Sequence, residues 1–177
     1  SARGDYKSPR EIIWDLADVV SKNGRLLLNF GPKPDGTFTR QDHEILSALG
    51  AWMKRNDEAI HGTGVWRIAQ EGPTAIREGQ FSDSEARQFT AEDFRFTCRG
   101  SSVYVIAMVC PEDGVLRVRS LREADASRLP VFHGIVRDVS VLGYDEKPAW
   151  TRDAQALTVD VDGIRSDLPL VLKVTVT

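Results

Sequence analysis

The spacing of hydrophobic residues near the start of the chain predicts a helix after Ser8. In a capping box the Ser8 hydroxyl and the Glu11 carboxylate each bond the other's backbone N–H group, and Pro9 suits the first helical position. Hydrophobic residues follow at 12, 13, 16, 17, 19 and 20, which places them on one face. Asn23-Gly24 then supplies a left-handed stop. We therefore expect an amphipathic helix that ends near Asn23.

The next hydrophobic run, Leu26-Leu27-Leu28, does not alternate with polar residues. This pattern predicts a strand buried on both faces, as in parallel sheets that helices cover. Such a strand needs neighbours on both edges. Residues 1–66 offer only this strand, with a helix on either side, so the missing strands must come from another chain or from sequence absent here. We expect this half to be the tail of a larger α/β domain.

A second helix is predicted after Thr39, because Asp42 follows three residues later as a weaker capping box. Ile45, Leu49 and Trp52 then fall on one face at helical spacing. The first part of the chain thus reads as helix, strand, helix.

From residue 65 onward the pattern changes to short hydrophobic runs separated by turns rich in Gly, Asp and Pro. About eight short strands without helical periodicity predict an antiparallel β-sandwich. We expect an α+β chain, with a helix–strand–helix unit over residues 1–64 and the sandwich over residues 65–177. The candidate strands are Val65–Ala69, Arg87–Thr90, Phe94–Cys98, Val103–Val109, Val115–Arg119, Ile135–Leu142, Ala156–Val161 and Leu170–Val176.

Charge and composition exclude several classes of protein. The formal net charge is −3, from 23 basic and 26 acidic residues, and neither half is basic, so a dedicated nucleic-acid binder is not expected. The longest hydrophobic run, Val103–Cys110, is far shorter than the roughly 20 residues that span a bilayer. Cys98 and Cys110 lie at the ends of a candidate hairpin, where pairing is conceivable, but two free thiols are favoured. The two cysteines therefore do not indicate the cellular compartment of the protein.

Three residues are candidates for sugar recognition. Asn29 follows the predicted buried strand, at the end where sites of α/β folds gather, and could face a cleft. Its amide could equally hold the following loop, and this structural role is favoured. Tyr144 and Trp150 could stack on sugar rings, although aromatic side chains of this kind more often pack in a core or at its rim.

The remaining polar residues give no clear catalytic or metal site. His43, His61 and His133 are too scattered to indicate a metal, and no metal or cofactor is expected. A glycosidase uses a pair of carboxylates, but the adjacent Asp57 and Glu58 near a helix terminus point in different directions. For this pair, solvated charge is the favoured interpretation.

Two segments of the first half resemble the family 29 α-L-fucosidases. Leu16–Thr37, with LADVVSKNGRLLLNFGPKPDGT, and Leu49–Thr63, with LGAWMKRNDEAIHGT, are each similar to a characteristic segment of that family. The second half is similar more loosely, through Val103–Pro111, Val141-Leu142-Gly143 and Trp150. The departures are few: Arg25, Phe30, Asp57, His61 and Cys110 replace the usual residues.

This resemblance implies a retaining exo-glycosidase with a (β/α)₈-like barrel followed by a β-sandwich. Residues 1–64 would be the C-terminal remnant of the barrel, with Leu26–Asn29 as its last strand, and residues 65–177 the sandwich. The family's nucleophile and acid/base are expected upstream of Ser1, so no catalytic residue is assigned within the chain. Asn29 would help to form the floor of the substrate site.

The resemblance also implies a function and partners. The parent protein is expected to remove terminal α-L-fucose from glycoconjugates, in a secreted, periplasmic or lysosomal location, with fucosylated glycans as partners and no nucleic acid or membrane. The fragment alone is expected to be inactive, with the sandwich supporting the barrel. The alternative is a carbohydrate-binding module that uses Trp150 or Tyr144. Either self-association through the exposed barrel remnant or a repacking of residues 8–56 onto the sandwich is also expected.

Overall fold

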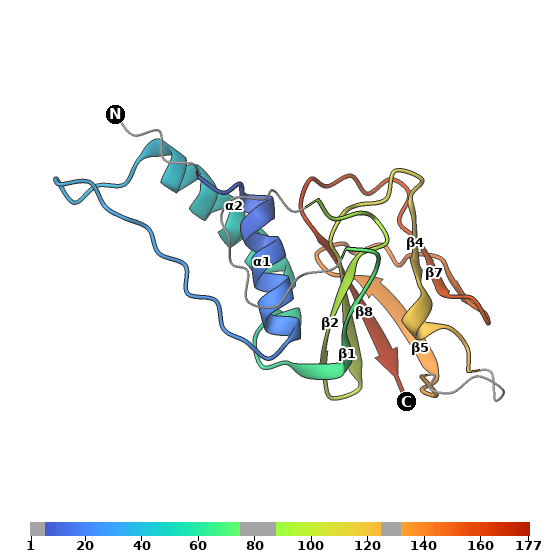
Figure 1. Cartoon of the computed structure of the whole chain (residues 1–177). Helices are drawn as coiled ribbons and strands as arrows, with labels where there is room; N and C mark the ends of the chain where they lie inside the picture. The colour runs from blue at the N-terminus through green and yellow to red at the C-terminus, as the bar shows by residue number, and fades with distance from the viewer. Residues whose placement is uncertain (1–5, 75–87, 125–131) are drawn as a thin grey trace.

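The computed structural model describes residues 6–74, 88–124 and 132–177. The described residues form three layers (Figure 1). Helices α1 (Pro9–Ser21) and α2 (Arg40–Asn56) cover one face of a five-stranded sheet, and a three-stranded sheet covers the other face. The predicted α+β class with an antiparallel sandwich is confirmed.

Both predicted helices begin with the capping boxes that the sequence indicates. At α1 the Ser8 N–H donates to the Glu11 carboxylate at 2.7 Å, while the Glu11 N–H donates to the Ser8 hydroxyl at 3.3 Å. At α2 Thr39 and Asp42 make the same reciprocal pair. The chain leaves α1 through Asn23, whose φ of 63° is left-handed, as the predicted stop requires.

All neighbouring strands pair in antiparallel fashion in both sheets. The last strand of the chain lies inside the larger sheet, so the chain's end is held between two earlier strands. The larger sheet has the order β1 (Gly64–Glu71), β2 (Phe94–Arg99), β3 (Ser102–Ala107), β8 (Leu170–Val176), β5 (Val136–Val141), and the smaller one β4 (Val115–Val118), β7 (Leu157–Asp160), β6 (Trp150–Arg152).

Strand β3 shows why the larger sheet is buried on both faces. Alternate residues of this strand, Val103 and Val105, join the core between the two sheets. The intervening residues, Tyr104 and Ile106, join the core beneath the helices. A strand covered on both sides carries a continuous hydrophobic run, as this one does, even though its neighbours are antiparallel.

The helix layer is attached to the sheet by hydrogen bonds as well as by packing. The Trp14 indole N–H of α1 donates to the Met108 carbonyl at 2.7 Å, and the Trp52 indole N–H of α2 donates to the Pro169 carbonyl at 2.8 Å. Both indoles are buried, so these bonds satisfy groups that would otherwise be costly to remove from water.

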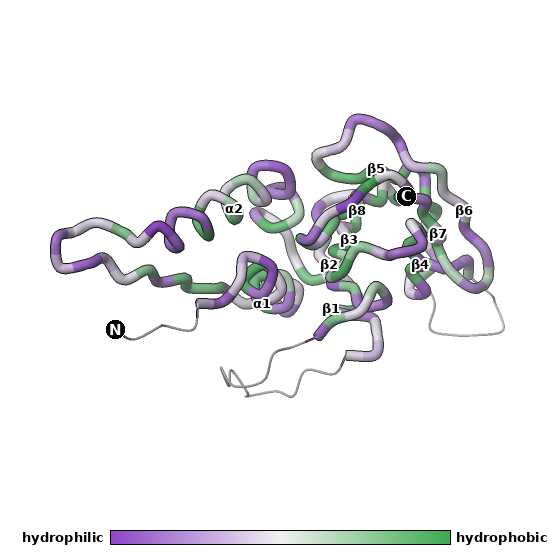
Figure 2. The backbone as a smooth tube through the Cα atoms, turned by 90° about the horizontal axis from the view of Figure 1, so that it is seen from above, coloured by the Kyte–Doolittle hydropathy of each residue, from purple (hydrophilic) through white to green (hydrophobic). Residues whose placement is uncertain are grey.

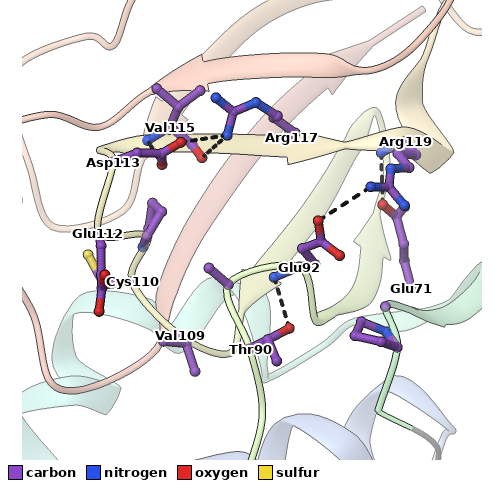
Figure 3. Close-up of a pocket in the computed structure, with 14 residues that line it drawn as sticks. Glu71, Thr90, Glu92, Val109, Cys110, Glu112, Asp113, Val115, Arg117 and Arg119 are labelled. Atoms are coloured by element: carbon purple, nitrogen blue, oxygen red, sulfur yellow. Dashed lines mark hydrogen bonds and ion pairs between the residues drawn. The ribbon is translucent and has the colours of Figure 1, made fainter.

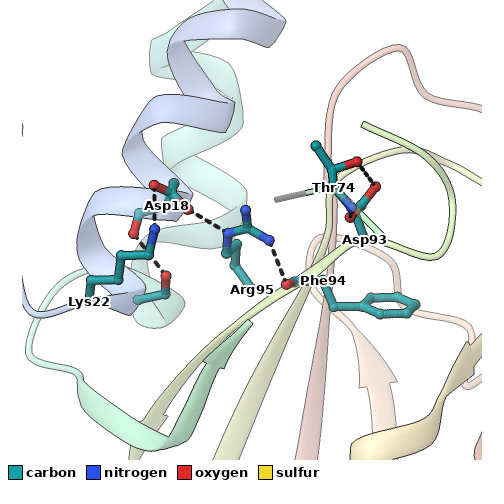
Figure 4. Close-up of polar contacts among 7 residues, drawn as sticks. Asp18, Lys22, Thr74, Asp93, Phe94 and Arg95 are labelled. Carbon is teal, nitrogen blue, oxygen red and sulfur yellow. Dashed lines mark hydrogen bonds and ion pairs between the residues drawn. The ribbon is translucent and has the colours of Figure 1, made fainter. Parts of the chain in front are cut away.

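A buried ion pair adds a further link between α1 and β2 (Figure 4). The Arg95 Nε donates to Asp18 Oδ1 at 2.7 Å, and the Arg95 Nη1 donates to the Phe94 carbonyl at 3.0 Å. The Arg95 side chain is 1% exposed, and its guanidinium lies over the Phe89 ring. Because a buried charge without a partner is strongly destabilising, this pair fixes where α1 sits on the sheet.

Two strand predictions differ from the structure. The predicted strand Arg87–Thr90 is absent: Arg87 lies outside the described residues, and residues 88–90 are not a strand. Instead Phe89 packs beneath α1, and Thr90 bonds the buried Asp93 carboxylate. The short strand β6 was not predicted, because three residues are too few for an alternating pattern to stand out.

The run Leu26–Leu28 does not form the predicted strand in the described structure. The segment joining α1 to α2 projects away from the sheets, and it carries a hydrophobic stretch (Figures 1 and 2). Leu27 is 92% exposed and Leu28 is 41% exposed. A strand needs a hydrogen-bonding neighbour, and no described strand pairs with this run, so Leu27 and Leu28 stay exposed while Leu26 is half-buried.

Candidate functional site

The structure does not bring the three predicted sugar-recognition residues together. Asn29 is exposed in the segment between α1 and α2. Trp150 lies in β6 and is half-buried against the core between the two sheets, a placement that favours packing. Tyr144 follows β5, is 36% exposed, and lines a cavity beside α2. Of the three, Tyr144 alone combines exposure with a concave surrounding.

A cavity with a volume of about 760 Å³ opens where the end of β1 approaches β4 (Figure 3). Its charged side chains, except that of Glu112, are paired with protein groups. Arg117 bonds Asp113 at 2.8 Å, and Arg119 lies 3.4 Å from Glu92. The Glu71 carboxylate accepts from the Arg119 N–H at 2.8 Å.

The paired side chains of the larger cavity therefore have structural roles. The Arg117 guanidinium and the Val115 N–H lower the pKa of Asp113, so this carboxylate stays ionised. A retaining glycosidase needs one carboxylate free to attack and a second that can give up a proton. Asp113, Glu92 and Glu71 are each engaged otherwise, which leaves Glu112 as a single carboxylate and not a pair, and none of the residues that line the cavity is aromatic.

The smaller cavity has a volume of about 230 Å³ and lies between the last turns of α2 and the segments that follow β5 and precede β8. Arg55 and Asn56 line it from the helix, and Tyr144 and Pro169 from the other side. Asn56 is 4% exposed, and its side-chain Nδ2 donates to the Trp52 carbonyl at 3.0 Å. Its Oδ1 has no partner among the described residues. A buried acceptor left unsatisfied costs about 1–3 kcal/mol.

Glu58 is not the solvated charge that the sequence favours. Its carboxylate accepts from the Lys173 ammonium at 2.7 Å and from the Tyr104 hydroxyl at 2.9 Å. The Lys173 hydrogen bond, with a further one from Tyr104, lowers the pKa of Glu58, although partial burial acts the other way. Glu58 thus links the short 3₁₀ turn Asp57–Ala59, which follows α2, to β3 and β8. Its neighbour Asp57 pairs with His61 instead.

Three further observations concern metal ligands, cysteines and membrane-spanning helices. Within residues 6–74, 88–124 and 132–177, no cluster of three or more His, Cys, Asp or Glu side chains could hold a metal. Cys98 and Cys110 are both free, as favoured from the sequence. Over the same ranges, no helix has the length and apolar character needed to cross a bilayer.

Comparison with known proteins agrees with this architecture. Residues 1–58 match the family model described as α-L-fucosidase. Human tissue α-L-fucosidase is 34% identical over 119 residues, which are 67% of this chain and 22% of that protein. Human plasma α-L-fucosidase is 43% identical over 70 residues, or 40% of this chain and 15% of that protein. The chain thus spans about a quarter or less of these relatives.

Solved structures extend the similarity to nearly the whole chain. The crystal structure of Thermotoga maritima α-fucosidase superposes with a TM-score of 0.70 at 25% identity, covering 98% of this chain and 36% of that one. A β-sandwich with a layer of helices on its larger sheet is thus the C-terminal architecture of a glycoside hydrolase. The chain belongs to the α-L-fucosidase family and corresponds to a C-terminal portion of its members.

Sequence reasoning missed Asn56 and Arg55 as cavity residues. The one available signal was the helical spacing of Trp52 and Asn56, which puts both on one side of α2. That signal does not say what faces the helix, because the opposite wall comes from residues about a hundred positions later.

Proposed function

We propose that this chain is the C-terminal part of a retaining exo-glycosidase that hydrolyses terminal α-L-fucose from glycoconjugates. The match of residues 1–58 to the family model carries the proposal. The nucleophile and the acid/base are supplied by residues outside this chain, and the sandwich supports the barrel that contains them.

The exposed segment between α1 and α2 supports this division of roles. Residues 1–64 are proposed to complete a (β/α)₈-like barrel, in which Leu26–Asn29 forms the last strand. Leu27 and Leu28 are exposed here, as expected for residues that neighbouring strands and helices of the barrel would cover. Asn29 then lies at the carboxyl end of a barrel strand, where active sites of such barrels are built.

The proposal is tested by assaying a longer protein that contains this chain. That protein should hydrolyse 4-nitrophenyl α-L-fucoside, and proton NMR of the first product should show retained anomeric configuration. The 177-residue chain alone should show no turnover in the same assay. Inversion, or no activity of the longer protein on any fucoside, would contradict the proposed function, and turnover by the chain alone would contradict the assignment of the chemistry to outside residues.

A second proposal concerns self-association of the chain by itself. The exposed Leu27 and Leu28 form an association site, because burying them against a second copy removes apolar area from water. Sedimentation should show concentration-dependent dimers, and Leu27→Ser with Leu28→Ser should shift the chain to monomer without changing its circular dichroism. A monomer at all concentrations, or dimers that persist in the double variant, would refute it.

A further inference from the structure

We propose that Asn23 is a site of covalent modification, where the side-chain amide is lost by spontaneous deamidation to aspartate and isoaspartate. Asn23 and Gly24 follow α1, and both are exposed. The co-reactant is water, and the product carries a new carboxylate that is ionised at neutral pH. The proposal goes beyond fucoside hydrolysis, and it concerns residues of this chain alone.

The end of α1 requires both residues of this pair. Asn23 has a left-handed φ of 63°, a region that glycine and asparagine adopt most readily. The Asn23 N–H donates to the Val20 carbonyl at 3.0 Å, and the Gly24 N–H donates to the Val19 carbonyl at 2.8 Å. A Cβ at Gly24 would lie 2.9 Å from that same oxygen and 2.7 Å from Val19 Cγ1. The geometry that closes the helix therefore places an asparagine directly before a glycine.

An asparagine in this position can react with the next backbone nitrogen. The Gly24 nitrogen attacks the Asn23 Cγ, the new C–N bond closes a cyclic succinimide, and the Cγ–Nδ2 bond breaks. The Gly24 amide proton leaves with the departing amino group as ammonia. Water then opens the ring at either carbonyl, which gives aspartate or isoaspartate. Glycine favours the first step because it has no side chain to hinder the approach of its nitrogen.

The hydrogen bond of the Gly24 N–H controls the rate in the folded chain. While this N–H donates to the Val19 carbonyl, its nitrogen is not free to lose the proton and attack. Helix ends open by local fraying at little cost in free energy, whereas a core opens only through global unfolding. No backbone N–H of residues 25–32 donates to a described residue, so the segment after the cap does not hold it closed. Asn23 therefore reacts through the frayed end of α1.

The other two asparagines of the chain serve as internal references. Asn29 is also exposed, but it precedes Phe30, whose side chain hinders the approach of the backbone nitrogen. Asn56 is 4% exposed, and its Nδ2 donates to the Trp52 carbonyl at 3.0 Å. Asn23 is thus the asparagine that should react first.

Modification should weaken the cap of α1. The new carboxylate lies at the C-terminal end of a helix, where the helix dipole disfavours negative charge. In isoaspartate the main chain also runs through Cβ and Cγ, so the left-handed backbone that closes the cap is lost. The modified chain should therefore have a lower melting temperature.

The test is peptide mapping by mass spectrometry of the 177-residue chain after incubation in mildly alkaline buffer, since the attacking nitrogen must lose its proton. The peptide that contains Asn23 should gain the mass difference between an amide and an acid about tenfold faster, or more, than the peptide that contains Asn29. Unfolding the chain in urea should raise the rate at Asn23 further. Equal rates at the two sites, or no conversion of Asn23 in the native chain, would overturn the proposal.

Variants connect the modification to the cap. Asn23→Gly suits the left-handed backbone and has no amide to lose, so its melting temperature should stay constant during the incubation in which that of the parent sequence falls. Asn29→Gln is the matched control at the other exposed asparagine, and it should leave the fall unchanged. A fall of equal size in Asn23→Gly would contradict a role for Asn23.

Discussion

The β-sandwich and the segment between α1 and α2 carry similar hydrophobic runs, yet the first run is buried and the second is largely exposed. Val103–Met108 is buried on both faces, because the three-stranded sheet covers one side and the helices cover the other. Leu26–Leu28 has no pairing strand among the described residues; Leu26 is half-buried, and Leu27 is 92% exposed. A hydrophobic run therefore favours burial, but the strands and helices around it determine whether the run is buried.

The largest contrast is expected from truncating one residue in each region. Phe96→Ala removes a fully buried ring from the core between the sheets and should lower the free energy of unfolding by about 3–5 kcal/mol. Leu27→Ala should change it by less than about 0.5 kcal/mol, because its side chain contacts water already. Urea denaturation of both variants checks this, and a large loss in Leu27→Ala would show that this segment is packed.

The attachment of α1 to the sheet should depend on its buried ion pair. Asp18→Leu leaves the buried Arg95 guanidinium without its carboxylate and should destabilise the chain by about 3 kcal/mol. The double variant Asp18→Leu with Arg95→Met should recover most of this loss, because no unpaired charge remains. Additive losses in the double-mutant cycle would instead indicate that the two residues act independently.

The N-terminal cap of α1 should have a smaller effect. Ser8→Ala removes the hydroxyl that accepts from the Glu11 N–H and should cost about 1 kcal/mol. Ser8→Thr is the matched control and should retain most of the stability. Thermal unfolding distinguishes the two, and equal melting temperatures for Ala and Thr would argue against a contribution from the cap.

The smallest effect is the pH dependence that arises from Glu58. Its lowered pKa contributes stability above the ordinary value of 4.5, and this contribution is lost as pH falls through the folded-state pKa. The hydrogen bond to Glu58 raises the pKa of Lys173, so the contribution of Lys173 to stability is present below 10.5 and is lost as pH rises through the folded-state value.

Glu58→Gln should flatten the stability profile at both ends, by less than about 1 kcal/mol because the carboxylate is partly exposed. Stability measured between pH 3 and pH 11 tests this. Asp57→Asn is the matched control at the adjacent position, and an unchanged profile in Glu58→Gln would contradict a role for the Lys173 pair.

Much of the fold could be predicted from local residues. Both capping boxes, the left-handed stop at Asn23 and most strands of the two sheets follow from short-range patterns that the tertiary structure leaves unchanged. The predicted strand at Arg87–Thr90 was wrong, because Phe89 is buried by the helix layer and not by alternation within a sheet.

The cavity beside α2 and the burial of β3 could not be predicted, since both depend on the contact between helices and sheet. Asn56 and Tyr144 are 88 positions apart, and nothing in either local sequence indicates the other. Leu26–Leu28 shows the converse case. Its sequence predicts a buried strand, but the described residues do not supply the neighbouring strands that such a strand needs.

Hydrogen exchange of backbone amides, followed by NMR in dilute monomeric chain, tests the comparison most directly. No amide of Leu26–Asn29 donates to a described residue, whereas the β3 amides lie within a central strand. We expect Val105 and Ile106 to exchange only through global unfolding, while Leu26, Leu27 and Leu28 exchange at nearly unprotected rates. Strong protection of the three leucines would contradict the account, because it would show that this chain provides their missing neighbours by itself.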